Sequence, residues 1–225
     1  MKYFSRFEKG LWLSSVSVIL LLFFAFDRQN WLTMMASLLG VTSILLNAKG
    51  NPVGQALMIV FGLVYGWISF DCAYYGEMIT YVGMTVPMAV AALVSWLRHP
   101  FKGNRAQVAV GRVGRREAAL MFGLAAGVTV GFYFILRAFG TANLLPSTLS
   151  VTTSFVAVYL TWRRSPYFSL AYAANDVVLI LLWLLAGIKN LSYLSVVGCF
   201  LAFLANDLYA FIAWRRMEKK QSLEA

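Results

Sequence analysis

The chain has 225 residues, of which 60% are hydrophobic and only 12% are charged, and its formal net charge is +10. A soluble domain of this length cannot bury so much apolar surface, so the composition excludes the ordinary globular classes and indicates an integral membrane protein. The charges gather at the ends of apolar segments and not along one face, which argues against a nucleic-acid-binding protein.

Eight apolar segments follow one another, each bounded by charges, proline or glycine. A helix rises about 1.5 Å per residue, so about 20 residues cross a hydrocarbon core of about 30 Å. The first segment is short for a membrane span, so it either crosses the membrane or lies in the membrane interface. The segments are 11–26, 31–47, 53–70, 78–97, 118–138, 144–162, 167–186 and 192–214.

The basic residues predict the orientation of these segments. If the N-terminus is cytoplasmic and all eight segments cross, then all but three of the 19 Lys and Arg residues lie on the cytoplasmic side. The exceptions are Arg28, Arg137 and Lys189. This positive-inside pattern predicts that both termini are cytoplasmic.

Two stretches, 31–98 and 144–216, repeat one pattern of a turn proline, a long apolar helix, a second loop and a last helix ending in Trp beside Arg. Two units that face the same way need an odd number of linking helices between them. We therefore predict an all-α integral membrane protein with two parallel three-helix bundles joined by a linker helix (3+1+3), plus an extra N-terminal hydrophobic helix. The predicted parts are 1–30 (additional helix), 31–98 (first repeat), 99–143 (basic loop and linker helix), 144–216 (second repeat) and 217–225 (cytoplasmic tail).

Three tryptophans close helices one or two residues before an arginine. Trp96, Trp162 and Trp214 all fall at the cytoplasmic surface in this topology. Indole rings are common at the headgroup level, and arginine is attracted by anionic lipid. We expect all three to be membrane-interface anchors.

The sequence carries no cluster typical of an enzyme or a metal site. Cys72 and Cys199 lack the spacing of a disulfide or metal framework, and His99, the one histidine, sits at a helix end. No phosphate-binding glycine loop is visible either. We expect no cofactor, no metal and no enzymatic activity, with a membrane-embedded enzyme or a scaffold as the alternative of another class.

Two acidic residues fall inside apolar segments, where ionisable side chains are costly and are often functional. Asp176 follows Asn175, and Asp207 follows Asn206. By helical rise both pairs lie roughly 12–14 Å from the cytoplasmic surface, close to the midplane. The pairs are predicted to line a polar cavity, or alternatively to join helices through hydrogen bonds.

Aromatic residues are expected beside this polar floor. Trp183 shares a helical face with Asn175, which favours a binding role. Trp67 holds a similar place in the first repeat, where the membrane-interface belt is an equal alternative. Tyr65, Tyr81 and Met88 complete the candidate wall, and Pro87 is expected to kink its helix there. Such a site suits a flat, cationic heteroaromatic ligand.

Several short stretches follow one another in a characteristic order and spacing. They are Val64-Tyr65-Gly66-Trp67, Tyr75-Gly76-Glu77-Met78, Pro87-Met88 leading to Trp96, Asn175-Asp176 through Trp183, and Asn206-Asp207-Leu208-Tyr209 through Trp214. Together they resemble the PnuC family of vitamin transporters, whose fold is like that of the SWEET transporters. The resemblance covers about residues 30 to 216, with the first segment as an addition.

The resemblance implies passive uptake of nicotinamide riboside, a precursor of NAD, made one-way by a cytoplasmic kinase that phosphorylates the incoming nucleoside. It also implies a bacterial inner membrane. Relatives carry thiamine or riboflavin, and thiamine is also a cationic heteroaromatic, so these vitamins are the alternatives. We further expect a homo-oligomer, with the additional first helix as the candidate intersubunit element.

Overall fold

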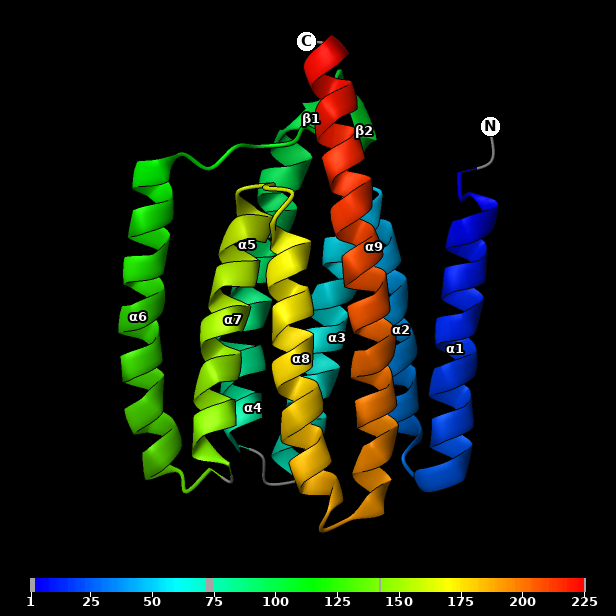
Figure 1. Ribbon diagram of the computed structural model, residues 1–225, viewed down its shortest axis with the longest axis vertical. Coiled ribbons are helices and arrows are strands. Elements are labelled where there is room, and N and C mark those ends of the chain that lie inside the picture. Colours follow the sequence, from blue (N-terminus) through cyan, green and yellow to red (C-terminus); the bar gives the residue numbers. More distant parts are fainter. Residues whose placement is uncertain (1–2, 72–74, 142, 225) are drawn as a thin grey trace.

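The computed structural model describes residues 3–71, 75–141 and 143–224, so Cys72 lies outside the described residues. Within these ranges, eight helices are long and apolar enough to cross a membrane. They run side by side along the long axis of the molecule (Figure 1). The elements are α1 Arg6–Phe26, α2 Trp31–Ala48, α3 Pro52–Asp71, α4 Tyr75–Thr80, the π-helical turn η1 Tyr81–Thr85, α5 Val86–Arg98, β1 Pro100–Phe101, β2 Asn104–Val108, α6 Arg115–Ala138, α7 Leu144–Trp162, α8 Phe168–Gly187, the 3₁₀ turn η2 Leu191–Tyr193 and α9 Leu194–Glu224.

Both chain ends and the β1–β2 hairpin lie at one end of the bundle, which we call the terminal end (Figure 1). The turns that join α1 to α2, α6 to α7 and α8 to α9 lie at the opposite end. At the terminal end the structure adds to the sequence pattern. The helix of the last apolar segment continues to Glu224 through the residues predicted as a tail, and the segment after Arg98 that is predicted as a loop contains a hairpin.

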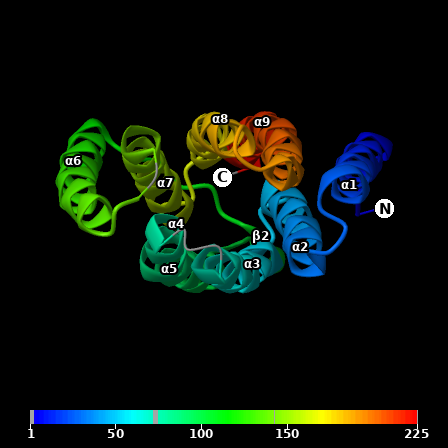
Figure 2. The same cartoon turned by 90° about the horizontal axis from the view of Figure 1, so that it is seen from below.

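Six helices form a closed ring, seen from below in Figure 2. Contacts follow the order α2, α3, α5, α7, α8 and α9, and α9 returns to α2. Two helices lie outside this ring: α6 packs on α7, and α1 packs on α9 and α2. The ring therefore encloses the space where the polar side chains of several helices meet.

The helix expected to kink at Pro87 is interrupted just before that residue by the π-helical turn η1. Proline lacks an N–H group, so Pro87 cannot donate the usual helical hydrogen bond to the carbonyl four residues earlier. The residue before it, Val86, donates its N–H to the Tyr81 carbonyl five residues back, which is the π-helical pattern. Such π turns are frequent at functional sites, and this one carries Tyr81 and Thr85 toward the interior of the ring, where both are buried.

The first helix is longer than its apolar run because polar residues extend it. Ser5 and Glu8 form a capping box, with the Glu8 N–H donating to Ser5 Oγ (3.2 Å) and the Ser5 N–H to Glu8 Oε2 (2.6 Å). The helix that results has 21 residues, which is long enough to span a bilayer.

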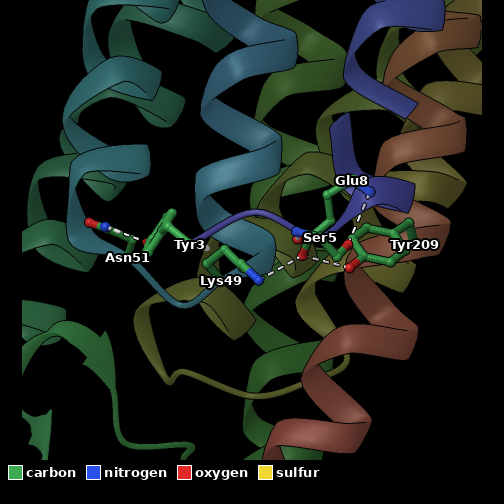
Figure 3. Close-up of polar contacts among 6 residues, drawn as sticks. All are labelled: Tyr3, Ser5, Glu8, Lys49, Asn51 and Tyr209. Atoms are coloured by element: carbon green, nitrogen blue, oxygen red, sulfur yellow. Dashed lines mark hydrogen bonds and ion pairs between the residues drawn. The ribbon is translucent and has the colours of Figure 1, made fainter. Parts of the chain in front are cut away.

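Glu8 also fixes this helix to the ring, as Figure 3 shows. Its carboxylate is only 2% exposed, and it accepts from Lys49 Nζ (2.8 Å) and from the Tyr209 hydroxyl (2.7 Å). Further along α1, the Trp12 indole N–H donates to Thr42 Oγ1 (3.1 Å). Because Lys49 and Thr42 belong to the α2 region and Tyr209 to α9, α1 is bonded to both sides of one seam of the ring.

Two of the three expected interface anchors are instead buried at the centre of the terminal end. Trp96 and Trp214 are both 0% exposed, and their ring centroids are 5.3 Å apart. The Trp96 indole donates to the Thr161 carbonyl (2.9 Å), and the Trp214 indole donates to the Asn47 carbonyl (2.7 Å). The anchor prediction was wrong for this pair because each indole finds a partner at the end of a helix from the other repeat. Trp162 is 38% exposed.

The hairpin segment lies across the same end and is held from three sides. The Val108 N–H donates to the Gly50 carbonyl (2.9 Å), and the Gly111 N–H donates to the Arg164 carbonyl (2.9 Å). Gln221 near the end of α9 donates to the Val108 carbonyl (3.0 Å) and accepts from the Val110 N–H (2.8 Å). The segment predicted as a loop is thus an ordered strap over the terminal end.

Candidate functional site

A cavity of about 30 Å³ lies inside the ring, which is room for about two water molecules. Both predicted repeats, 31–98 and 144–216, contribute side chains to it. None of the lining residues is Lys, Arg or His, whereas two are aspartates. The lining residues are Ile44, Asn47, Met58, Phe61, Tyr81, Thr85, Ser154, Phe168, Tyr172, Asn175, Asp176, Phe200, Phe203 and Asp207.

The two aspartates come from neighbouring helices, Asp176 from α8 and Asp207 from α9, and their carboxyl groups lie beside each other. Each residue is 3% exposed, and neither forms an ion pair with a described residue. The Oδ2 atom of Asp176 is buried without a hydrogen-bond donor among the described residues. Two adjacent acids without a cation hold a shared proton or attract a positive ligand.

Asn175 is held in place by the neighbouring helix α7. Its Oδ1 accepts hydrogen bonds from Thr153 Oγ1 (2.7 Å) and Ser154 Oγ (3.0 Å). Since the amide oxygen is already engaged twice, the orientation of the side chain is fixed, and its NH₂ group is the part that remains for a ligand.

Aromatic rings form the wall of the cavity toward the first repeat. The Phe61 ring lies 5.9 Å from the Tyr81 ring and 5.6 Å from the Phe203 ring, both edge to face. Tyr65 stands behind this layer, with its ring centroid 4.5 Å from that of Tyr81, and is not part of the lining. Tyr65 therefore supports the wall and does not face the cavity.

The structure brings Asn175, Asp176, Asp207 and Tyr81 together around the central cavity, as the sequence predicts. It places other predicted residues elsewhere. The Asn206 amide donates to Ser15 Oγ of α1 and to the Ala202 carbonyl, both at 2.8 Å, so it joins helices and does not face the cavity. This corresponds to the alternative of interhelical hydrogen bonding.

Three further predicted residues also lie outside the central cavity. Trp67 is 64% exposed on the outer surface of α3, the position of the belt alternative, and Met88 is half-buried outside the lining. Trp183 is buried, but it lines a second, smaller cavity nearer the opposite end, together with Glu77. Helical periodicity correctly predicts that Trp183 points into the bundle, but it does not predict which of the two cavities Trp183 lines.

Asn47 is a lining residue that the sequence reasoning missed. Its Oδ1 accepts from Gln55 Nε2 (2.9 Å), and both side chains are buried inside apolar helices. The test applied to Asn175, a polar residue within an apolar segment, would have found this pair. The lining phenylalanines carry no such signal, because phenylalanine is common at every helix face of a membrane protein.

Comparison with known proteins shows the family. The sequence profile described as nicotinamide mononucleotide transporter matches residues 30–216. A curated relative, the nicotinamide riboside transporter PnuC of Neisseria mucosa, is 24% identical over 223 residues, covering 97% of this chain and 84% of that protein.

The fold is similar to one solved by crystallography. The crystal structure of the vitamin B3 transporter PnuC superposes with a TM-score of 0.84 at 22% identity, and the match covers 98% of this chain and 95% of that one. With eight helices of membrane-spanning length, the chain is a multi-pass membrane protein, and it belongs to the PnuC family of transporters.

Proposed function

We propose that this protein mediates passive uptake of nicotinamide riboside. The observation that carries the proposal is the central cavity, which joins two buried aspartates to a wall of aromatic rings and has no basic residue in its lining. A pyridinium ring is flat and positively charged, so it gains from cation–π contact with the rings and from attraction by the carboxylates. The name of the Neisseria mucosa relative supports the same substrate.

The lining also favours the riboside over the mononucleotide that the family description names. A phosphate group carries additional negative charge and is usually bound by arginine, lysine or a helix N-terminus. The lining has no Lys or Arg, and Asp176 and Asp207 would repel the phosphate. We therefore infer that the substrate enters without its phosphate, and that a cytoplasmic nucleoside kinase traps it afterwards.

In this proposal Asp176 and Asp207 face the charged ring, the Asn175 amide donates to a carboxamide or hydroxyl oxygen, and Tyr81 contributes an aromatic face. Phe61 supports Tyr81 from the side. Trp67, Met88 and Asn206 are not assigned contacts because they lie outside the lining. Trp183 is assigned to the path that leads to the cavity, and Tyr65 is assigned to the support of the cavity wall.

A cavity of about 30 Å³ is far smaller than the roughly 300 Å³ or more of ordinary ligand sites, so the two halves must separate to admit a nucleoside. We propose that residues 31–98 and 144–216 act as two three-helix units, linked by 99–143 in a 3+1+3 arrangement, that rock about the central site. The reciprocal bonds of Trp96 and Trp214 support a related role for the two units.

The proposed setting is a bacterial inner membrane with both termini cytoplasmic, so the terminal end faces the cytoplasm. The excess of basic residues supports this orientation. Residues 1–30 form an additional helix fixed to the seam, and 217–225 extend the last helix. We keep a homo-oligomer as part of the proposal, since α1 exposes large apolar side chains such as Leu21.

Thiamine is the second candidate, because it too is a cationic heteroaromatic and would satisfy the same aspartates. Riboflavin has no such charge and gains less from this lining. A competition experiment on the purified protein decides among nicotinamide riboside, nicotinamide mononucleotide, thiamine and riboflavin. We expect the riboside to bind most tightly, and tighter binding of another vitamin would name that vitamin as the substrate.

Transport itself is tested in proteoliposomes loaded with radiolabelled riboside. Equilibration across the bilayer without an ion gradient is the expected result. An absence of solute movement would favour the membrane enzyme or scaffold class. Faster uptake under an imposed proton or sodium gradient, measured at zero voltage, would contradict the passive mechanism.

A further inference from the structure

A further buried acid, outside the central cavity, lies toward the opposite end of the bundle. Glu77, in the first turn of α4, is only 5% exposed. Its carboxylate forms no ion pair and no hydrogen bond with any described residue. Keeping such a group buried within a membrane helix is costly, so an unpartnered acid there calls for a function.

Glu77 faces a small cavity at the seam between the two repeats. The cavity is formed by α4, by the turn before α7 and by the last turns of α8. Its polar side chains are neutral except for Glu77, and Trp183 supplies its aromatic surface. The lining includes Glu77, Asn143, Ser147 and Trp183.

Aromatic residues of one buried cluster line both cavities, Trp183 the small one and Tyr81 the central one. Tyr81 follows Glu77 by one helical turn, so both lie on the same face, and Tyr81 lines the central cavity. The Tyr65 ring lies 4.5 Å from the Tyr81 ring and belongs to the same buried cluster as Trp183. Acid, aromatic cluster and acid therefore succeed one another from the opposite end toward the middle.

From this succession we propose that Glu77 and Trp183 form an outer binding station for the organic cation, which the substrate occupies before it reaches Asp176 and Asp207. The inference rests on the proposed function and adds a further specificity-determining residue. A carboxylate attracts the positive charge of a flat cation, and the face of an indole ring attracts the same cation through a cation–π contact. The cavity measures about 10 Å³, so it takes the ring when α4 and α8 move apart at the opposite end.

The test compares wild type with Glu77→Gln, which keeps the size of the side chain and removes its charge. Asp71→Asn is the matched control, because Asp71 ends α3 at the same end of the bundle but is exposed. Uptake into proteoliposomes is measured for nicotinamide riboside and for its dihydro form, which has the same outline but no ring charge. A third variant, Glu77→Asp, restores the charge.

We expect Glu77→Gln to raise the half-saturation concentration for the cation by about fivefold, the upper range for an ion pair that water reaches, because the station must open to admit the ring. Uptake of the uncharged dihydro form by Glu77→Gln should stay within about twofold of wild type. Asp71→Asn should transport both ligands within the same twofold range, and Glu77→Asp should do so for the cation. Equal losses for both ligands would identify Glu77 as a merely structural residue and overturn the proposal. A Glu77→Gln variant that takes up the cation as wild type does would also overturn the proposal.

These outcomes are separable from a failure of the proposed function. If wild type moves neither form of the riboside, the proposed substrate is wrong and the station has no cation to bind. If wild type transports the riboside normally and the Glu77 variants match it, only the outer station is refuted.

Discussion

The two ends of the helix bundle are closed in different ways. At the terminal end, two fully buried indoles donate hydrogen bonds across the repeats, and Gln221 of α9 holds the strap over them. At the opposite end lies the small cavity lined by Trp183 and Glu77, and the Glu77 carboxylate has no ion-pair partner among the described residues. Directional bonds must break before the terminal end can part, whereas the small cavity is a gap in the packing of the opposite end. The opposite end should therefore open at lower free-energy cost.

The largest expected effect comes from breaking the terminal end. Trp96→Ala or Trp214→Ala removes a large buried ring and a hydrogen bond, and each should cost about 3–5 kcal/mol of stability. Thermal unfolding of the detergent-purified protein measures the loss. Trp67→Ala is the matched control, since Trp67 is 64% exposed and should cost no more than about 0.5 kcal/mol. Equal melting temperatures for Trp96→Ala and Trp67→Ala would contradict the importance of the buried pair.

The next effect concerns the cavity that lies between the two ends. Asp176→Asn and Asp207→Asn keep the shape of the lining but lower its negative charge. Each should weaken binding of nicotinamide riboside by about 1–3 kcal/mol, the range for a hydrogen bond or contact with a charged group. Isothermal titration calorimetry measures this, with the uncharged dihydro form as the reference ligand. Tighter binding of the cation to either variant would refute the proposed charge recognition.

A smaller effect is expected where α1 bridges the seam at the terminal end. Lys49→Met removes the cation that faces the Glu8 carboxylate, but Lys49 keeps 28% exposure, so water partly compensates. We expect a destabilisation of about 1–2 kcal/mol, below the cost for a fully buried pair. A double-mutant cycle with Glu8→Gln, read by thermal unfolding, isolates the pair. Additive losses would show that the two side chains do not stabilise each other.

The smallest expected effect lies at the opposite end, at the turn after α1. Burial raises the pKa of Asp27, and the hydrogen bond from Ser195 Oγ (3.4 Å) opposes this only in part. A raised pKa means that the folded state holds the proton more tightly than the unfolded state. Stability should therefore fall as the pH rises from the ordinary aspartate value through the raised pKa.

Asp27→Asn should remove this pH dependence and stabilise the protein at neutral pH by about 0.5 kcal/mol or less, because the group is largely solvated. Thermal unfolding of both proteins between pH 4 and pH 7 provides the comparison. A variant that is less stable than wild type at pH 7 would show that the Ser195 hydrogen bond outweighs burial.

Much of the candidate site could be predicted because its residues are rare in lipid. Asp176 and Asp207 stand out in apolar segments, and both line the cavity. The same rule indicates Asn206, yet that amide bonds to Ser15 of α1, because the additional helix offers a partner that the three-helix pattern does not contain. Position along a helix indicates which residues share a face but not which neighbouring helix that face contacts.

The length of α1 was left open by its apolar run, which understates it, although the sequence holds a signal for it. Ser5 and Glu8 have the spacing of a capping box, which places the helix start before the first apolar residue. The buried position of Trp96 and Trp214 was not readable in this way. A Trp beside an Arg is typical of the membrane surface, and only the packing of the other repeat against it decides otherwise.

By itself the sequence determined the membrane class, the number of long apolar helices, the family of the protein and the presence of acids inside apolar segments, since hydropathy acts locally along the chain. Tertiary structure decided which polar groups face one cavity, which indoles are buried and which acid is left without a partner. Those outcomes depend on contacts between residues far apart in sequence, and a one-dimensional pattern does not contain the distances between helices.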